Sequence, residues 1–407
     1  MISVEDALAR IRESLTPLGA ETVSLAEAHG RVLAEDLAAR RTQPPFAVSA
    51  MDGYAVRAAD IAALPTRLKL VGYVPAGGRH EGEVGPGEAV RIFTGARLPE
   101  GADAVVIQED TEAHDAEILV RDTVGAFGPG RHVRQAGIDF VEGQVGLAAG
   151  RRLTARDIGL AAAMNRPWLS VYRRPRIAIL PTGDEVVLPG DPIGANQIVS
   201  SNGAALGALV AAAGGVPVQL GIARDDSDTL KTMARGAEGA DLLVTIGGAS
   251  VGEHDLVKKA LGEIGFAIDF WKIAMRPGKP LMFGHLGGTP VLGLPGNPVS
   301  ALVCGMLFLR PAIDRLQGLP GLGPQPERAQ AGAALDANDG RQDYMRARLT
   351  HDPSGTLVAT PFRRQDSSMM SALAGADCLI LRPPAAPAVP VSGSIEIIRL
   401  GEPGALL

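Results

Sequence analysis

The sequence predicts a multidomain α/β protein organised around a parallel sheet. Within residues 173–318, short apolar runs alternate with helix-like stretches, and several runs end in a glycine-rich or acidic loop. Strands that alternate with helices favour a parallel sheet covered by helices on both faces. Residues 46–146 instead carry short β-type runs among many Gly and Pro residues, and residues 326–401 carry a second series of short strands. We therefore expect a mostly β inserted domain, a small helical domain and a C-terminal β-barrel-like domain beside the parallel-sheet domain.

In the N-terminal part, helices are expected where apolar residues recur at helical spacing, over residues 3–15 (with Ser3 as the cap), 25–36 and 153–163. Strands are expected at 68–74, 89–93, 104–108 and 117–120. The predicted domains are an N-terminal helix in 1–26 that packs on the central domain, a discontinuous helical domain in 27–45 and 147–172, and the β-rich insertion in 46–146.

The central domain is predicted to span residues 173–318. Its strands are expected at 176–180, 216–223, 241–246, 268–274 and 290–294, with helices over 201–213, 226–237 and 298–309. A Gly/Pro-rich linker over 318–326 then leads into the C-terminal β domain, residues 326–401.

Composition limits the possible partners. The chain has 407 residues, of which 46% are hydrophobic and 21% charged, and this is typical of a globular protein. Aromatic residues make up only 4% and the net charge is −6, so we expect no nucleic-acid partner. Two cysteines are too few for a disulfide framework, and the apolar run 301–309 is too short to cross a bilayer. We expect a cytoplasmic protein that does not bind membranes.

The loops that follow the strands carry the candidate chemistry, because ligands of parallel sheets bind beyond the carboxyl ends of the strands. Three of these loops are acidic: Asp184 and Glu185, Asp225 and Asp226, Glu253 and Asp255. Carboxylates that converge at one edge would repel each other unless a cation joined them, and oxygen ligands suit Mg²⁺. Each acid could instead be a helix cap, but three successive loops favour a metal site with Glu185, Asp225, Asp226 and Asp255 as candidate ligands.

A cationic segment and two glycine-containing loops complete this edge. Lys272, Arg276 and Lys279 would face phosphate, pyrophosphate or an oxyanion. The loop after the strand at 241–246 offers backbone N–H groups for a phosphate at Gly247, Gly248 and Ser250, although such loops are also ordinary turns. In residues 294–300, Asn297 can cap a helix that starts at Pro298, which is either a rigid turn or part of the site.

The inserted β domain gives a weaker signal. Asp52 precedes Gly53 in a turn pattern, and residues 93–96 and 134–139 form similar polar turns. Physical reasoning alone makes these ordinary hairpins. No Ser/His/Asp or Cys/His arrangement can be recognised in the sequence.

Several motifs occur together in a characteristic order, at residues 49–55, 93–106, 134–139, 181–185, 245–255, 277–280, 294–300 and 367–377. With them the chain resembles the molybdopterin molybdenumtransferase family, which includes MoeA and the E domain of gephyrin. The central domain alone would be ambiguous, because it resembles the molybdopterin adenylyltransferase (MogA-like) fold. The MDGY motif at 51–54, Thr94-Gly95 and the C-terminal β domain make the resemblance specific.

The resemblance implies Mg²⁺-dependent insertion of molybdate into adenylylated molybdopterin, with release of AMP. It also implies a homodimer and contacts with molybdopterin adenylyltransferase and acceptor molybdoenzymes. Asp52, Thr94 and Asp139 would come from one subunit, and the other would supply Glu185, Asp225 and Asp255 for metal and pyrophosphate chemistry. The remaining implied positions are Lys272, Arg276 and Lys279 for molybdate or phosphate, Pro295 and Pro298 for the pocket loop, and Ser371 near the ligand.

The chain departs from the family pattern at Ala47 and Val48, at Ile138, at Arg276 in place of a lysine, and at Asp377-Cys378. These changes leave the choice between molybdate and tungstate open. Two alternative functions also remain: a non-catalytic dimeric scaffold of the gephyrin E-domain type and a molybdopterin adenylyltransferase. The acidic loops and Thr94-Gly95 argue against the scaffold, and the intact N-terminal motifs argue against the adenylyltransferase.

Overall fold

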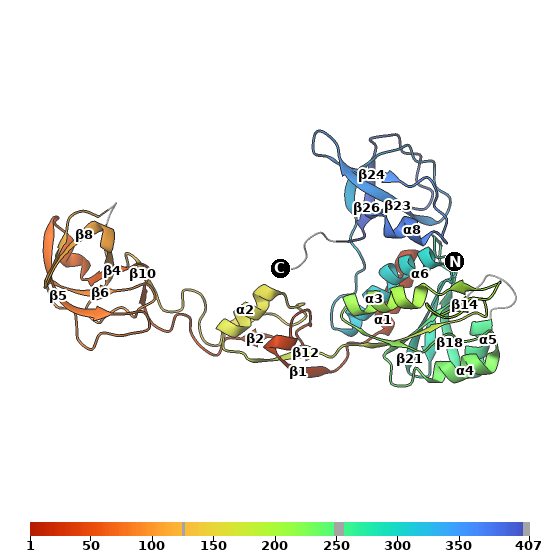
Figure 1. Ribbon diagram of the computed structural model, residues 1–407, viewed down its shortest axis with the longest axis horizontal. Coiled ribbons are helices and arrows are strands. Elements are labelled where there is room, and N and C mark those ends of the chain that lie inside the picture. Colours follow the sequence, from red (N-terminus) through yellow and green to blue (C-terminus); the bar gives the residue numbers. More distant parts are fainter. Residues whose placement is uncertain (124–126, 248–255, 402–407) are drawn as a thin grey trace.

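A computed structural model describes residues 1–123, 127–247 and 256–401. The molecule is elongated (Figure 1), with a β domain at one end, a small domain in the middle and two domains packed together at the other end. No helix within the described residues is long and apolar enough to cross a membrane.

The distal domain is a six-stranded sheet in the order β7-β4-β6-β5-β9-β8. Its strands are β4 (Gly53–Val56), β5 (Thr66–Val74), β6 (Glu88–Ile92), β7 (Ala104–Ile107), β8 (Thr111–His114) and β9 (Glu117–Val120), with short helices η2 (Ala58–Ile61) and η3 (Gln108–Asp110). The four strands predicted here are confirmed. The turn expected around residues 49–55 forms, but the expected hairpin is wrong, because β4 pairs with β6 and β7 and not with the strand that precedes the turn. A Cβ on Gly53 would collide with the backbone of Val106, so only glycine allows this close pairing.

The middle domain consists mainly of short strand pairs: β1 (Ala20–Ser24) with β12 (Trp168–Tyr172), and β2 (Leu37–Ala38) with β11 (Val145–Leu147). Its α-helix is α2 (Ala155–Ala163). The helix expected over 25–36 is wrong, since only η1 (Leu25–Glu27) forms. Gly30 has φ +74, and Val32 and Leu33 then form β-bridges, so the chain is extended where a helix was predicted. The pair β3 (Val48–Ser49) and β10 (Val133–Arg134) lies where this domain leads into the distal one.

The central domain contains the six-stranded sheet β16-β13-β17-β21-β20-β18. Its strands are β13 (Arg176–Pro181), β16 (Val216–Gln219), β17 (Leu242–Ile246), β18 (Phe266–Trp271), β20 (Met282–Leu286) and β21 (Thr289–Leu294). The sheet is not wholly parallel as predicted, because β20 is antiparallel to both of its neighbours. A turn of two glycines, Gly287 and Gly288, joins β20 to β21, and so short a connection can only produce an antiparallel pair.

Helices cover both faces of this sheet. On β13, Ile177 and Ile179 pack into the larger hydrophobic cluster, whereas Ala178 and Leu180 pack into the opposite one. The larger cluster includes α1 (Val4–Ser14), α3 (Asn202–Ala212) and a long helical stretch made of α6 (Pro298–Cys304), η4 (Gly305–Leu309) and α7 (Arg310–Leu316). The opposite cluster includes α4 (Ser227–Arg235) and α5 (Leu256–Glu263). The small pair β14 (Val186–Val187) and β15 (Ile198–Val199) projects from the loop after β13.

The C-terminal domain is a closed barrel, as predicted. Strand β23 (Gln342–His351) pairs with both β24 (Leu357–Pro361) and β25 (Cys378–Arg382), and the ring closes through β22 (Glu327–Ala331) and β26 (Ser394–Arg399). Helix α8 (Met370–Ala374) packs toward α6. The short strand β19 (Met275–Arg276) of the central domain adds in parallel to β23. The cationic segment therefore lies at the junction between the barrel and the central domain.

Candidate functional site

The loops after four neighbouring strands meet at the carboxyl edge of the central sheet. The backbone N–H of Thr182, after β13, donates to the carbonyl of Ile246 at 2.9 Å. The N–H of Gly247, after β17, donates to the carbonyl of Leu294 at 3.1 Å, and the N–H of Gly183 donates to Ala223 at 3.0 Å. The prediction that these distant turns share one edge is therefore confirmed for the residues that the structure describes.

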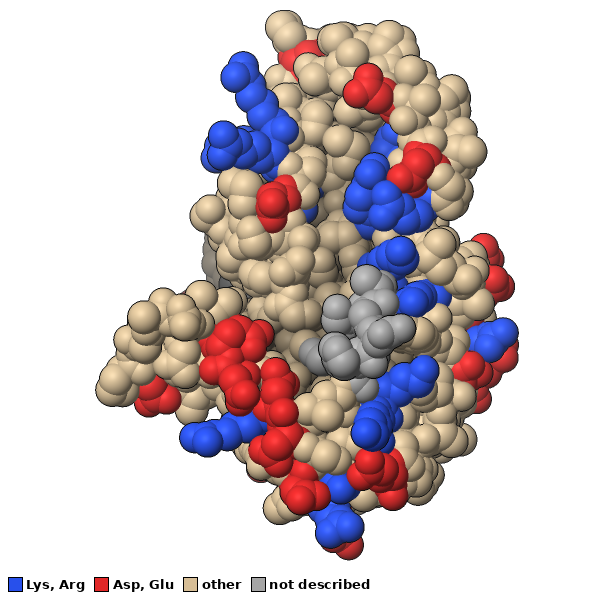
Figure 2. Space-filling model, turned by 90° about the vertical axis from the view of Figure 1, so that its right-hand side faces the viewer, with Lys and Arg blue, Asp and Glu red and all other residues tan. Residues whose placement is uncertain are grey.

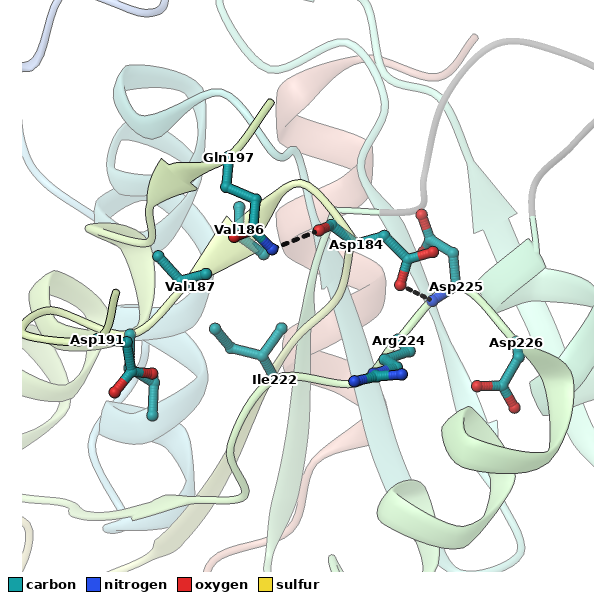
Figure 3. Close-up of a pocket in the computed structure, with 11 residues that line it drawn as sticks. Asp184, Val186, Val187, Asp191, Gln197, Ile222, Arg224, Asp225 and Asp226 are labelled. Carbon is teal, nitrogen blue, oxygen red and sulfur yellow. Dashed lines mark hydrogen bonds between the residues drawn. The ribbon is translucent and has the colours of Figure 1, made fainter. Parts of the chain in front are cut away.

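Two carboxylates face each other on one side of this edge. The backbone N–H of Asp225 donates to Oδ1 of Asp184 at 3.3 Å, and Figure 3 shows the two side chains pointing toward one another. Burial raises the pKa of Asp225, and the negative charges of Glu185 and Asp184 raise this pKa further. This group thus carries uncompensated negative charge. Asp184 was not among the predicted ligands, although its place beside Glu185 in the same loop was a usable signal.

Asp226 has a different environment from Asp225. It is the N-cap of α4, and its Oδ1 accepts the backbone N–H of Thr229 at 2.7 Å. Hydrogen bonds from the side chain and from the backbone N–H of Thr229 lower the pKa of Asp226. Asp226 is therefore a helix cap through this oxygen, which is the alternative to a metal ligand that the sequence left open. Asp225 does not cap a helix.

A pocket of about 700 Å³ adjoins the acidic pair. One part of its wall is polar, formed by Asp184, Asp225, Arg224 and Gln197 among others, and another part is apolar, formed by Val186, Val187, Leu188 and Ile222 (Figure 3). A wall of this kind can receive a molecule with both a flat apolar part and a charged part.

The carboxylates fit a divalent cation by their chemistry, since like charges raise the pKa of Asp225 and a cation would relieve them. Within the described residues, no group of three or more His, Cys, Asp or Glu side chains converges closely enough to hold a metal ion. The predicted ligand Asp255 lies outside the described residues, as do Gly248 and Ser250. A Mg²⁺ ion here would need further oxygen ligands, and Mg²⁺ commonly takes these from substrate phosphates and water.

The cationic segment follows β18 at the far side of the same sheet. The ammonium group of Lys272 lies 3.7 Å from the centroid of the Trp271 ring. Arg276 forms ion pairs with Asp343 and, at 3.6 Å, with Asp339 of the C-terminal barrel. The sequence predicted a ligand for this guanidinium but not these partners.

The turn that carries Lys279 is fixed by close packing. Gly278 has φ +117, and a Cβ at this position would lie 2.5 Å from Sγ of Cys304 in α6. The carbonyl of Lys279 accepts the backbone N–H of Ile273 at 3.0 Å. Glycine is therefore required here both by its backbone conformation and by the contact.

The loop with Pro295 and Pro298 joins the central domain to the barrel. The side-chain amide of Asn202 donates to the carbonyl of Gly296 at 2.6 Å. Asn297 occupies the N-cap position of α6 as predicted, but its side-chain amide donates to Oγ of Ser367 at 2.8 Å instead of capping the helix. Neither Asn202 nor Ser367 was a predicted site residue.

Ser371 lies near that contact in α8, and its side chain is exposed. Figure 2 shows the face formed by the barrel and the central domain. Lys and Arg side chains gather near the junction of the two domains, whereas Asp and Glu gather along one side of the central domain.

Asp52 and Thr94 lie far from this edge. Oδ1 of Asp52 accepts hydrogen bonds from the backbone N–H and the hydroxyl of Thr94, each at 2.8 Å, and these bonds lower the pKa of Asp52. Both residues lie in the distal domain, at the opposite end of the molecule from the central sheet (Figure 1). Asp139 is exposed where the distal and middle domains join, and its backbone N–H donates to the carbonyl of Gln43 at 3.1 Å. One chain therefore does not bring the predicted residues of the two groups together.

Three family models match consecutive parts of the chain. The MoeA N-terminal region (domain I and II) matches residues 2–165, a molybdopterin binding domain matches residues 178–315, and the MoeA C-terminal region (domain IV) matches residues 328–400. The pocket and the acidic pair thus lie within the part of the chain that matches the model described as "Probable molybdopterin binding domain".

Relatives of the whole chain agree with this division. Molybdopterin molybdenumtransferase 2 of Mycobacterium tuberculosis is 37% identical over 369 residues, which cover 88% of this chain and 90% of the relative. Molybdopterin molybdenumtransferase of Haemophilus influenzae is 35% identical, with 94% of each chain covered. The crystal structure of a molybdopterin biosynthesis MoeA protein from Pyrococcus horikoshii superposes with a TM-score of 0.85 at 32% identity, covering 99% of this chain and 100% of that one.

The class defined by these findings is a transferase of molybdenum cofactor biosynthesis, as the resemblance in the sequence implied. The chain belongs to the MoeA family, the molybdopterin molybdenumtransferases.

Proposed function

We propose that this protein catalyses the Mg²⁺-dependent insertion of molybdate into adenylylated molybdopterin, with release of AMP. The observation that supports it best is the order of charges along one sheet edge. The acidic pair follows β13 and β16 at one side, the cationic segment follows β18 at the other, and the loops after β17 and β21 lie between them. Such an edge can receive a metal, a pyrophosphate and an oxyanion side by side.

The acidic loops are proposed to hold the metal. Of the proposed ligands, Glu185, Asp225 and Asp226 lie within the described residues, and Asp255 would add to the set. Mg²⁺, when bound, would stabilise the negative charge on the departing phosphate. Gly248 and Ser250 would offer backbone N–H groups to phosphate oxygens. The N–H predicted for this role at Gly247 is already used, because it donates to the carbonyl of Leu294. The apolar part of the pocket beside Asp184 would exclude water from one side of the substrate.

The cationic segment is proposed to hold molybdate, a tetrahedral dianion. Lys272 and Lys279 would bind its oxygens directly, and Arg276 would contribute its charge from its ion pair with the barrel. Pro295 and Pro298 keep the neighbouring loop in shape, and Ser371 would approach from α8. No side-chain nucleophile is needed, because the molybdopterin substrate brings its own sulfur ligands for the molybdenum.

A second copy of the chain is proposed to complete the site. Asp52, Thr94 and Asp139 lie at a distance from the central edge of their own chain. Apolar side chains beside them are unusually exposed: Met51 is 41% exposed and Ile138 is 66% exposed. Exposed apolar side chains beside polar ones are typical of a protein–protein contact. In a two-fold dimer the distal domain of each subunit would meet the central edge of its partner.

The transferase assay tests the proposed activity. Purified protein supplied with adenylylated molybdopterin, Mg²⁺ and molybdate should release AMP and yield a cofactor that reconstitutes an apo-molybdoenzyme. Asp225→Ala should abolish both results with little loss of folding. A protein that binds the cofactor but releases no AMP would be the scaffold, and one that makes adenylylated product from ATP and unmodified molybdopterin would be an adenylyltransferase.

Subunit mixing tests the shared site. Asp52→Ala and Asp225→Ala homodimers should each be inactive, but a heterodimer would contain one site with both residues intact. Random exchange of equal amounts should restore about a quarter of wild-type activity. No recovery, despite exchange shown by differently tagged subunits, would mean that each chain forms its site alone.

We also propose a cytoplasmic location and transfer contacts with molybdopterin adenylyltransferase and acceptor molybdoenzymes. Both proposals rest on the same family pattern.

A further inference from the structure

The backbone at Lys272 has an unusual conformation. Strand β18 ends at Trp271, which pairs with Met282 of β20, and the N–H of Lys272 still donates to the carbonyl of Leu281 at 3.0 Å. Lys272 itself has φ +68, a region that long side chains rarely adopt. Residues kept in such conformations are concentrated at ligand-binding and active sites.

This conformation allows two consecutive side chains to touch. Neighbouring residues of a strand normally point to opposite faces. Here the turn at Lys272 brings its ammonium group to 3.7 Å from the centroid of the Trp271 ring. The ammonium group of Lys258, from α5, lies 4.5 Å from the centroid of the same ring. One indole therefore contacts two positive charges.

The choice of tryptophan is explained by these cations and not by a hydrogen bond. The indole ring packs against the hydrophobic cluster of α4 and α5, which fixes its position. Its Nε1 is buried and has no hydrogen-bond partner among the described residues, a cost that phenylalanine would avoid. Tryptophan has the aromatic face that attracts cations most strongly.

We propose that Trp271 is a positioning residue that holds the ammonium group of Lys272 in place for a tetrahedral oxyanion at the sheet edge. The inference rests on the proposed function, in which Lys272 binds molybdate. A free lysine side chain would lose rotational freedom when the anion arrives. A lysine already held over a fixed ring has lost much of that freedom beforehand, so the anion binds more tightly.

Binding of molybdate alone to the full-length protein tests this role through a double-mutant cycle. Lys272→Met should weaken molybdate binding about tenfold or more and Trp271→Leu by about threefold to tenfold, whereas the double variant should bind within about twofold of Lys272→Met. Trp271→Phe should fall between Trp271→Leu and wild type. Trp168→Leu is the matched control, because Trp168 is 62% exposed in the middle domain, and it should bind like wild type.

The outcomes separate the two proposals. Weakened binding in Lys272→Met with unchanged binding in Trp271→Leu would overturn the positioning role and leave the proposed function intact. If the losses of binding in the two single variants add up in the double variant, the positioning role of Trp271 is overturned as well. Unchanged molybdate binding in Lys272→Met would show that Lys272 does not bind molybdate. The proposed molybdate site and the positioning role of Trp271 would then both be wrong.

A second readout needs no anion. After reductive ¹³C-dimethylation, the Lys272 methyl resonance, assigned by its loss in Lys272→Met, should be shifted upfield by the ring current of Trp271. Trp271→Leu should return it to the position of an exposed lysine. If Trp271→Leu does not fold, Trp271→Phe serves, with a smaller upfield shift expected from the smaller ring. A wild-type resonance already at the exposed-lysine position would overturn the proposal.

Discussion

Thr94 donates two hydrogen bonds, from its backbone N–H and its hydroxyl, to a single carboxylate oxygen of Asp52. Both residues lie in loops next to the strands of the distal domain, 42 positions apart in the chain. These hydrogen bonds favour the charged form of the carboxylate and orient it, although Asp52 is partly exposed to solvent. A carboxylate held in this way suits the dimer site proposed above.

Thr94→Val should raise the pKa of Asp52 toward its ordinary value. The backbone hydrogen bond remains, but the hydroxyl bond, which also lowers this pKa, is lost. A pH titration of the ¹³C-labelled carboxyl groups by NMR would measure the change. Thr111→Val is the matched control, since the Thr111 hydroxyl donates to the carbonyl of Gln108 in the same domain and does not touch Asp52. If the pKa of Asp52 is unchanged in Thr94→Val, the backbone hydrogen bond alone sets this pKa.

Gly278→Ala should destabilise the protein by about 2–4 kcal/mol. Alanine is strained at φ +117, and its methyl group would lie 2.5 Å from Sγ of Cys304. Urea unfolding would measure the loss. Gly288→Ala is the control, because a Cβ there would meet nothing within 4 Å. The double variant Gly278→Ala/Cys304→Ala should recover part of the loss, because it relieves the clash and leaves the backbone strain.

The sequence predicted the parts of the fold that depend on local pattern. Strand β17 is buried on both faces and appears as an apolar run interrupted only by Thr245, so it was found. The segment 25–36 has apolar residues at helical spacing, but its later part forms β-bridges to Arg152 and Val171 of the same domain, and no local pattern shows those partners. Strand β20 was missed because only its pairing on both sides distinguishes it from a loop.

Several residues of the candidate site can be recognised in the sequence, but their contacts cannot. Asp184, Asp225 and Lys272 all stand out from their positions after strands. The bond between Asn297 and Ser367 and the ion pair between Arg276 and Asp343 join segments separated by 70 and 67 positions. Such pairs depend on how the barrel packs on the central domain, which a single sequence does not reveal.

The stabilisation of the wild-type protein by Mg²⁺ should be largest near neutral pH and should shrink as the pH falls to where Asp225 becomes protonated. The pKa of Asp225 is raised in the folded state, so its charged form destabilises the fold above that pKa, and the penalty disappears as the pH falls through it. A cation relieves the penalty only where Asp225 is charged. Thermal unfolding with and without Mg²⁺ would test this. Asp225→Asn should lose most of the Mg²⁺ effect, whereas Asp228→Asn, an exposed acid on α4, should keep it.

Arg276→Met should destabilise the protein by about 1–3 kcal/mol, because it leaves the carboxylate of Asp343 buried without its cation. One oxygen of Asp343 already has no hydrogen-bond partner among the described residues, so the ion pair with Arg276 carries much of its compensation. Arg276→Met/Asp343→Asn should recover most of the loss, since the buried charge is then removed as well. Arg10→Met is a matched control: Arg10 pairs with Asp269 at an exposed site, where ion pairs contribute little. Equal losses in both single variants, measured by urea unfolding, would show that Asp343 does not depend on Arg276.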